Sequence, residues 1–346
     1  MGADGRDKRA SGLRALSFLV VAAALLFSIV TAASAQQWVP NRSGMPWPSG
    51  AVGCCGGMSA LQAFRGRKLD FRTTYLFRDS WAAMIAHAGS VGGLVADGAA
   101  AVVALGLMPE THRAQHRQCR LGQFDPQIRS VGAALVRAGT PRAILRLGWE
   151  ANRLNGYPWN VTGDGSEYKA CFRRWVSVLR TVPGQRFVID WNMQEKSIFP
   201  PDRMYPGDDV VQIIGIDVYD RCPPLHDERR WLGWLNAKHN DGRNPRGPGA
   251  WLAFARQHGK KLSIPEWGIG GPSRVRFCVE PGFDNPMFVR RWFGFLRENA
   301  ASIAYEGYFN AHGSSDDSLG SHKLAPARYN PGSAAVYLQL WGLPSP

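Results

Sequence analysis

The strongest constraint on the fold is a repeated alternation, along most of the chain, between short apolar segments and helical stretches. Eight segments have the length and pattern of strands, at residues 51–55, 69–77, 99–108, 142–149, 186–192, 210–219, 260–267 and 302–310. Apolar residues at helical spacing follow most of them, at residues 59–65, 80–88, 126–138, 167–180, 249–258, 286–299 and 333–341. This pattern predicts a single α/β domain folded as a (β/α)₈ TIM barrel, whose usual size is ~250 residues plus insertions.

A doubly wound open sheet would show a similar alternation. No glycine-rich phosphate loop follows the first predicted strand, so the barrel is favoured. We find no internal repeat, linker or change of composition within residues 36–346, and we expect one barrel catalytic domain there. The chain is rich in aromatic residues, with thirteen Trp. These residues fit either a large aromatic core or a cleft that stacks on sugars.

Residues 1–35 have the pattern of a secretory signal peptide. Basic residues precede an apolar run over residues 16–30, and Ala33-Ser34-Ala35 supplies a small-x-small cleavage pattern. The run is shorter than the ~20 residues of a membrane-spanning helix. We therefore expect cleavage after Ala35 and a secreted protein, extracellular or periplasmic, with no stable membrane insertion; a retained anchor is the alternative.

The chain is basic, with a net charge of +14. Such a charge favours contact with anionic surfaces or acidic polymers. The basic residues are scattered rather than clustered in a run or a known nucleic-acid module. We expect a solvated basic surface, no nucleic-acid partner and a monomer.

All six cysteines follow the predicted signal, at positions 54, 55, 119, 171, 222 and 278. An even number of cysteines in an exported protein predicts disulfides. Six cysteines allow 15 full pairings, and the sequence leaves the connectivity open. Their spacing does not resemble a zinc site.

Two predicted strands end in glutamate. The fourth ends in Trp149-Glu150 and the seventh in Glu266-Trp267, and active sites of TIM barrels lie at these strand ends. Arg146 lies four residues before Glu150, so alternation predicts that both point into the barrel. A rim salt bridge would explain one glutamate. Two carboxylates facing one pocket predict a retaining glycosidase, which needs an acid/base and a nucleophile about 5–5.5 Å apart.

The chain resembles glycoside hydrolase family 26, which includes β-mannanases. The matching segments are RLGWEANRLNGYPW (residues 146–159), WNMQEKSIFPPDRMYPGDDVVQIIGIDVYD (residues 191–220) and KKLSIPEWGIGG (residues 260–271), with a weaker match at residues 60–81. The resemblance implies a (β/α)₈ retaining hydrolase. It implies that Glu150 is the general acid/base, that Glu266 is the nucleophile and that Tyr219 lies beside the nucleophile.

One position departs from the family pattern. Mannanases of this family usually have His immediately before the acid/base glutamate, where this chain has Trp149. In this respect the chain is more similar to a related branch of uncharacterised secreted proteins. The departure leaves the mechanism intact and leaves three substrate classes open: mannan-like polysaccharide, β-glucan and exopolysaccharide.

Neighbouring side chains suit the two roles of the glutamates. A general acid needs a raised pKa, which the apolar walls of Trp149 and Trp159 would supply by desolvation. A nucleophile needs a stabilised charge, which Arg146 or Tyr219 would supply.

We expect Arg146, Trp149 and Tyr219 to belong to the substrate-binding site as well, and other polar and aromatic residues are further candidates. Asn152 and Asn192 would donate to sugar hydroxyls, with capping of loops as the alternative. Trp81, Trp159, Trp191 and Trp267 would stack on sugar rings, with packing at the rim as the alternative for each.

No cofactor is predicted. His112 and His116 have a spacing that can bind a metal on a helix, but Pro109 and polar neighbours indicate a loop with two exposed histidines. We expect no metal, nucleotide or redox group.

The sequence therefore predicts a secreted retaining glycoside hydrolase acting on a β-linked polysaccharide. The alternative is a non-catalytic carbohydrate-binding barrel in exopolysaccharide assembly. A binding protein has no need of two carboxylates, which favours the enzyme.

Overall fold

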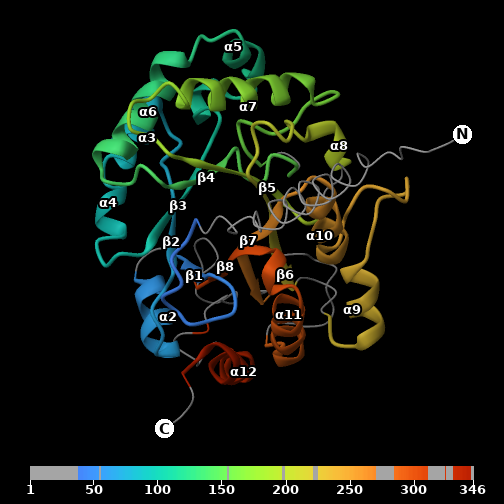
Figure 1. Ribbon diagram of the computed structural model, residues 1–346. Coiled ribbons are helices and arrows are strands. Elements are labelled where there is room, and N and C mark those ends of the chain that lie inside the picture. Colours follow the sequence, from blue (N-terminus) through green and yellow to red (C-terminus); the bar gives the residue numbers. More distant parts are fainter. Residues whose placement is uncertain are drawn as a thin grey trace, which may run out of the picture. The chain divides into compact units, whose positions relative to one another are not determined.

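Eight parallel strands close into a barrel in sequence order, which confirms the predicted (β/α)₈ fold (Figure 1). The computed structural model describes residues 38–53, 56–153, 156–196, 199–220, 225–269, 284–310, 324 and 330–343. The strands are β1 (Ser49–Val52), β2 (Phe71–Tyr75), β3 (Ala100–Leu105), β4 (Ile144–Leu147), β5 (Val188–Gln194), β6 (Ile213–Asp220), β7 (Lys261–Ile269) and β8 (Ile303–Phe309). The pairing of β8 with β1 closes the barrel.

Helices surround the strands (Figure 1). They are α2 (Gly57–Arg65), α3 (Trp81–Ala88), α4 (Val91–Leu94), α5 (His116–Arg120), α6 (Asp125–Arg137), α7 (Ser166–Leu179), α8 (Pro201–Met204), α9 (Glu228–Leu235), α10 (Pro248–Gln257), α11 (Pro286–Glu298) and α12 (Pro331–Trp341), with 3₁₀ helices η1 (Glu110–His112) and η2 (Ala300–Ser302). Proline stands in the first turn of α10, α11 and α12, where a missing N–H breaks no helical hydrogen bond. Within the described ranges, none of these helices has the length and apolar character needed to cross a membrane.

The aromatic residues mainly build the core between the barrel and its helices. Eight Trp side chains are among the largest fully buried ones. Three of them, Trp47, Trp267 and Trp341, donate their indole N–H groups to the buried carboxylate of Glu306. The high tryptophan content therefore belongs largely to the core, and a sugar cleft is not needed to explain it.

A disulfide joins Cys119 of α5 to Cys171 of α7, with 5.2 Å between their Cα atoms. The predicted use of cysteines in disulfides is confirmed for this pair. The other four cysteines, at positions 54, 55, 222 and 278, lie outside the described residues, as does the predicted signal at residues 1–35.

The barrel interior changes from apolar to polar along its axis. Residues at the starts of the strands form an apolar cluster that includes Phe71, Val102 and Ile213. Above them, the buried carboxylate of Asp190 accepts hydrogen bonds from Ser263 and Tyr305.

Asp190 also requires a glycine on the adjacent strand. A Cβ atom at Gly215 would lie 2.5 Å from both Asp190 Oδ1 and Ser263 Oγ. A side chain of any size there would displace Asp190 and Ser263, which lie below the candidate site in the barrel.

Asp190 gives the fold a specific pH dependence. Burial raises the pKa of its carboxyl to about 6, against the opposing effect of its two hydrogen bonds. The unfolded chain releases this proton near pH 4, so the folded protein binds more protons between about pH 4 and 6 and loses stability as the pH rises through that range. The pKa difference corresponds to about 3 kcal/mol at pH 7.

We predict that Asp190→Asn removes this loss, because the amide cannot ionise. Urea unfolding of both proteins between pH 4 and 7 should show the stability of the variant rising relative to the wild type by about 3 kcal/mol. The exposed Asp209→Asn is the control and should show no such rise. Parallel pH profiles for wild type and Asp190→Asn would contradict the assignment.

Candidate active site

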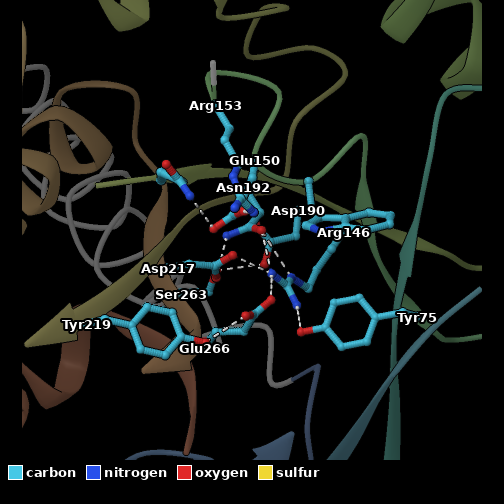
Figure 2. Close-up of polar contacts among 12 residues, drawn as sticks. Tyr75, Arg146, Glu150, Arg153, Asp190, Asn192, Asp217, Tyr219, Ser263 and Glu266 are labelled. Carbon is cyan, nitrogen blue, oxygen red and sulfur yellow. Dashed lines mark hydrogen bonds and ion pairs between the residues drawn. The ribbon is translucent and has the colours of Figure 1, made fainter. Parts of the chain in front are cut away.

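Arg146 lies at the centre of a buried polar network at the carboxyl ends of the strands. Its guanidinium has no exposed surface. Nη2 donates to Glu266 Oε1 at 2.6 Å, to Asp217 Oδ2 at 2.7 Å and to Asn192 Oδ1 at 2.7 Å. Nη1 lies 3.5 Å from the hydroxyl of Tyr75. One cation on β4 therefore ties together side chains from β2, β5, β6 and β7 (Figure 2).

Glu266 reaches this network through a bulge in β7. Gly215 pairs with Ser263 and Asp217 pairs with Glu266, so β7 uses three residues where β6 uses two. The extra residue allows Ser263 and Glu266 both to point into the barrel, and Pro265 lies between them. In Figure 2, Tyr219 and Tyr75 approach this carboxylate from opposite sides. Tyr219 donates its hydroxyl to Glu266 Oε2 at 2.9 Å.

The network moves the pKa values of its two carboxyl groups, those of Glu266 and Asp217, in opposite directions. Burial alone would raise the pKa of Glu266, but Arg146 and hydrogen bonds from Tyr75 and Tyr219 lower it below its usual value. Burial and the charge of Glu266 hold the pKa of Asp217 well above its usual value, although Arg146 opposes this. Glu266 is thus the ionised partner of Arg146 at neutral pH, as a nucleophile must be.

Glu150 lies in the turn that follows β4. The predicted strand ends earlier than expected, at Leu147, and both Gly148 and Glu150 have positive φ angles, of 59° and 50°. Side-chain alternation therefore does not orient Glu150. Its N–H donates to the carbonyl of Asn192 at 2.9 Å, which holds a backbone conformation that non-glycine residues rarely adopt.

The carboxylate of Glu150 is almost buried and is held by hydrogen bonds. Gln194 donates to Oε1 at 3.0 Å, the hydroxyl of Tyr157 lies 3.5 Å from Oε2, and Arg153 lies 3.6 Å from Oε2. Burial and the charges of Glu150 and Glu266 raise the pKa of Tyr157 to about 12. The carboxylates of Glu150 and Glu266 therefore both lie close enough to Tyr157 to raise its pKa.

Three of the predicted sugar-stacking tryptophans cannot stack on a sugar. Trp159, Trp191 and Trp267 have no exposed surface, so this prediction is wrong for them. Trp191 and Trp267 each follow an inward-pointing residue on a strand, so they point outward into the helix layer, where Trp191 contacts Trp251.

Two further aromatic residues lie nearer the surface. Trp149 is 3% exposed and packs against Tyr75, Tyr157 and Trp159, as the predicted apolar wall beside Glu150 requires. Trp81 is 8% exposed and packs against Phe124 and Trp175, so packing is the better account of it.

The two asparagines are already committed to other protein groups. Asn152 donates to the carbonyl of Gln194 and accepts from its N–H, at 2.8 and 2.9 Å. Asn192 accepts from Arg146 and donates to Asp217. The alternative of loop capping fits Asn152, and binding of sugar hydroxyls by the two residues stays a prediction.

A cleft of about 1010 Å³ opens beside the aromatic wall of the site. Tyr75, Trp149 and Tyr157 line it, as do Arg72 and Asp97 on the β2 side. Glu150 and Glu266 are not among its lining residues, so the cleft lies beside the two carboxylates and does not enclose them.

The structure does not support a metal role for the histidine pair. His116 is buried rather than exposed as expected, and one of its ring nitrogens lies 3.2 Å from the carbonyl of Trp159. In the part of the chain that the structure describes, no group of three or more His, Cys, Asp or Glu residues could hold a metal ion.

Sequence comparison relates the chain to a mannan-degrading enzyme. It is 26% identical over 194 residues to a mannan endo-1,4-beta-mannosidase of Bifidobacterium adolescentis, a match that covers 53% of this chain. The chain spans only 18% of the length of that curated relative. No protein-family model matches the chain.

Solved structures identify the type of barrel. The catalytic domain of a family 26 endo-beta-1,4-mannanase from Bacillus sp. JAMB-750 superposes with a TM-score of 0.57 at 14% identity, covering 87% of this chain and 88% of that one. A family 26 beta-mannanase from Bacteroides ovatus gives a TM-score of 0.56 at 12% identity, covering 85% and 88%. An endo-beta-1,4-mannanase double mutant from Cellulomonas fimi gives 0.55 at 18% identity, covering 80% and 67%. The barrel has the fold of the glycoside hydrolase family 26 β-mannanases.

We predict that Arg146→Met lowers the free energy of unfolding at pH 7 by about 3–5 kcal/mol, because it leaves Glu266 as an uncompensated buried charge. The loss should shrink towards pH 4, because without Arg146 the folded protein protonates this carboxyl more readily. Urea unfolding at both pH values measures it.

The control for this variant is Arg173→Met, which breaks an exposed ion pair with Asp209. It should cost less than about 1 kcal/mol. An equally small effect of Arg146→Met at pH 7 would show that Arg146 does not hold the network.

Proposed function

We propose that the chain is a retaining glycoside hydrolase that cleaves a β-linked, mannan-type polysaccharide by double displacement, with Glu266 as nucleophile and Glu150 as general acid/base. The observation that carries the proposal is the pair of nearly buried carboxylates after β4 and within β7, of which Glu266 is held ionised by Arg146 and Tyr219. A purely carbohydrate-binding barrel would gain nothing from burying two carboxylates at the same end of the barrel.

In the first half-reaction, an oxygen of Glu266 bonds to the anomeric carbon. Glu150 gives its proton to the glycosidic oxygen as the bond to the leaving sugar breaks. In the second, Glu150 takes a proton from water as the water oxygen bonds to the anomeric carbon and Glu266 leaves. Trp149 packs against Tyr75 and Tyr157, and the hydroxyl of Tyr157 lies beside Glu150.

The substrate class rests on the relatives. The curated relative acts on mannan, and the solved structures with this fold include β-mannanases. Trp149 stands where mannanases of the family usually have His, so β-glucan and exopolysaccharide belong in the same substrate panel. Release of reducing ends from mannan alone supports a mannanase, and release from another glycan alone would replace mannan as the substrate.

We also propose that the protein is exported and loses residues 1–35, with the Cys119–Cys171 disulfide as support because disulfides persist in oxidising compartments. Mass spectrometry of the exported protein should give an N-terminus at Gln36, and an intact Met1 in a membrane fraction would contradict cleavage.

We predict that variants of the two glutamates are blocked in different half-reactions. Glu266→Ala cannot form the covalent intermediate, and azide that fills the cavity should give a glycosyl azide of inverted configuration. Glu150→Ala keeps the nucleophile, so an aryl glycoside with a good leaving group should still react, and azide should restore turnover with retained configuration.

Both variants should lose at least about 10²–10⁴-fold in hydrolysis of polysaccharide. Kinetics with and without azide, and NMR of the products, measure these outcomes. Near wild-type hydrolysis in both variants would refute the assignment of the two glutamates.

A further inference from the structure

The side chain of Tyr157 is held in one orientation beside Glu150. Its ring stacks on Trp159 with 4.8 Å between the ring centroids and an angle of 4° between the planes. The guanidinium groups of Arg78 and Arg153 lie 5.1 and 5.7 Å from its centroid. Packing and cation–π contacts therefore fix the position of the hydroxyl, 3.5 Å from Glu150 Oε2.

The contacts of Glu150 distinguish its two oxygens. Gln194 donates an amide N–H to Oε1 at 3.0 Å. An N–H group cannot accept a hydrogen bond, so Oε1 meets it with a lone pair. The hydroxyl of Tyr157 can accept as well as donate, so Oε2 can carry the acid proton beside it. Tyr157 lies on the side of Oε2, the oxygen that loses and regains the proton.

We propose that Tyr157 is a positioning residue for Glu150, donating its hydroxyl to Oε2 when the carboxylate is ionised and so holding it as the base of the second half-reaction. This role rests on the proposed function. The tyrosine keeps its own proton throughout, since its pKa is raised to about 12. The only proton transferred moves from Oε2 to the glycosidic oxygen and, in the second step, from water back to Oε2.

Several other charged or titratable groups also face Glu150. Arg153 comes from the same loop, and Asp217 and Tyr219 on β6 interact electrostatically with Glu150. Glu266 of β7 interacts with Tyr157, as Glu150 does. Tyr157→Phe leaves all of them in place and keeps the stacked ring, so it isolates the effect of one hydroxyl.

The test compares wild type and Tyr157→Phe by two measurements. NMR with ¹³C-labelled glutamate follows the titration of Glu150, whose signal is identified by its absence in Glu150→Gln. Loss of a donor to the ionised form should raise the pKa of Glu150 by about half a unit to one unit. The alkaline limb of the pH profile of kcat/KM should move to higher pH by the same amount.

Kinetics separate this role from a general effect on structure. With an aryl glycoside whose departure needs no acid, glycosylation should stay within about twofold of wild type. Deglycosylation should slow by about 3–10-fold, because the base is less well held. The matched control is Tyr168→Phe, which removes a buried hydroxyl on α7, and it should change neither quantity.

The outcomes distinguish this proposal from the proposed function. If wild type hydrolyses glycans but Tyr157→Phe changes neither the pKa of Glu150 nor deglycosylation, the positioning role is overturned and the hydrolase stands. If the pKa shift is seen while wild type hydrolyses no glycan in the panel, the contact between Tyr157 and Glu150 is real, but the hydrolase assignment is overturned and with it the role of Tyr157 in positioning a base.

Discussion

The buried guanidinium of Arg146 is the interaction on which the site depends. Burying a cation with no exposed surface is unfavourable unless the cation is paired and fully hydrogen-bonded. Arg146 is hydrogen-bonded to Glu266, Asp217 and Asn192, and these contacts offset the loss of solvation. These partners stand on three different strands, so the cation also fixes how the ends of those strands sit together. The same contact that stabilises the barrel rim keeps Glu266 ionised.

Environment gives the acidic residues of the site different tasks. Asp217 and Glu266 share one cation, and their pKa values move in opposite directions, so one carries a negative charge and the other favours its proton. Glu150 lies in a turn with positive φ, where Gln194 donates to its carboxylate. Gln194 holds the candidate acid/base, whereas Arg146 and Tyr219 hold the candidate nucleophile, which suits two residues with different roles in one reaction.

Much of this arrangement follows from periodicity, and the errors follow from it as well. Alternation of strands and helices predicted the barrel, and the strand ends drew attention to Glu150 and Glu266. Alternation of side chains along a strand would also have shown that Trp191, between the inward-pointing Asp190 and Asn192, points outward. It would also have placed Asp217, two residues before Tyr219, inside the barrel.

Other features of the site cannot be predicted from a periodic pattern of apolar and polar residues. The bulge at Pro265 and the positive φ of Glu150 are set by tertiary contacts, and the commitment of Asn152 to the backbone of Gln194 depends on how two loops meet. The contact between Tyr157 and Glu150 likewise depends on the path of the loop after β4.

Covalent trapping of Glu266 tests the central claim most directly. A 2-deoxy-2-fluoro-β-mannoside with a good leaving group should glycosylate the nucleophile and release the intermediate slowly. Peptide mass spectrometry should then find one sugar per chain on the peptide that contains Glu266, in wild type and in Glu150→Ala, and none in Glu266→Ala. A sugar attached to any other residue, or no trapped sugar on a protein that hydrolyses β-mannosides, would contradict this account.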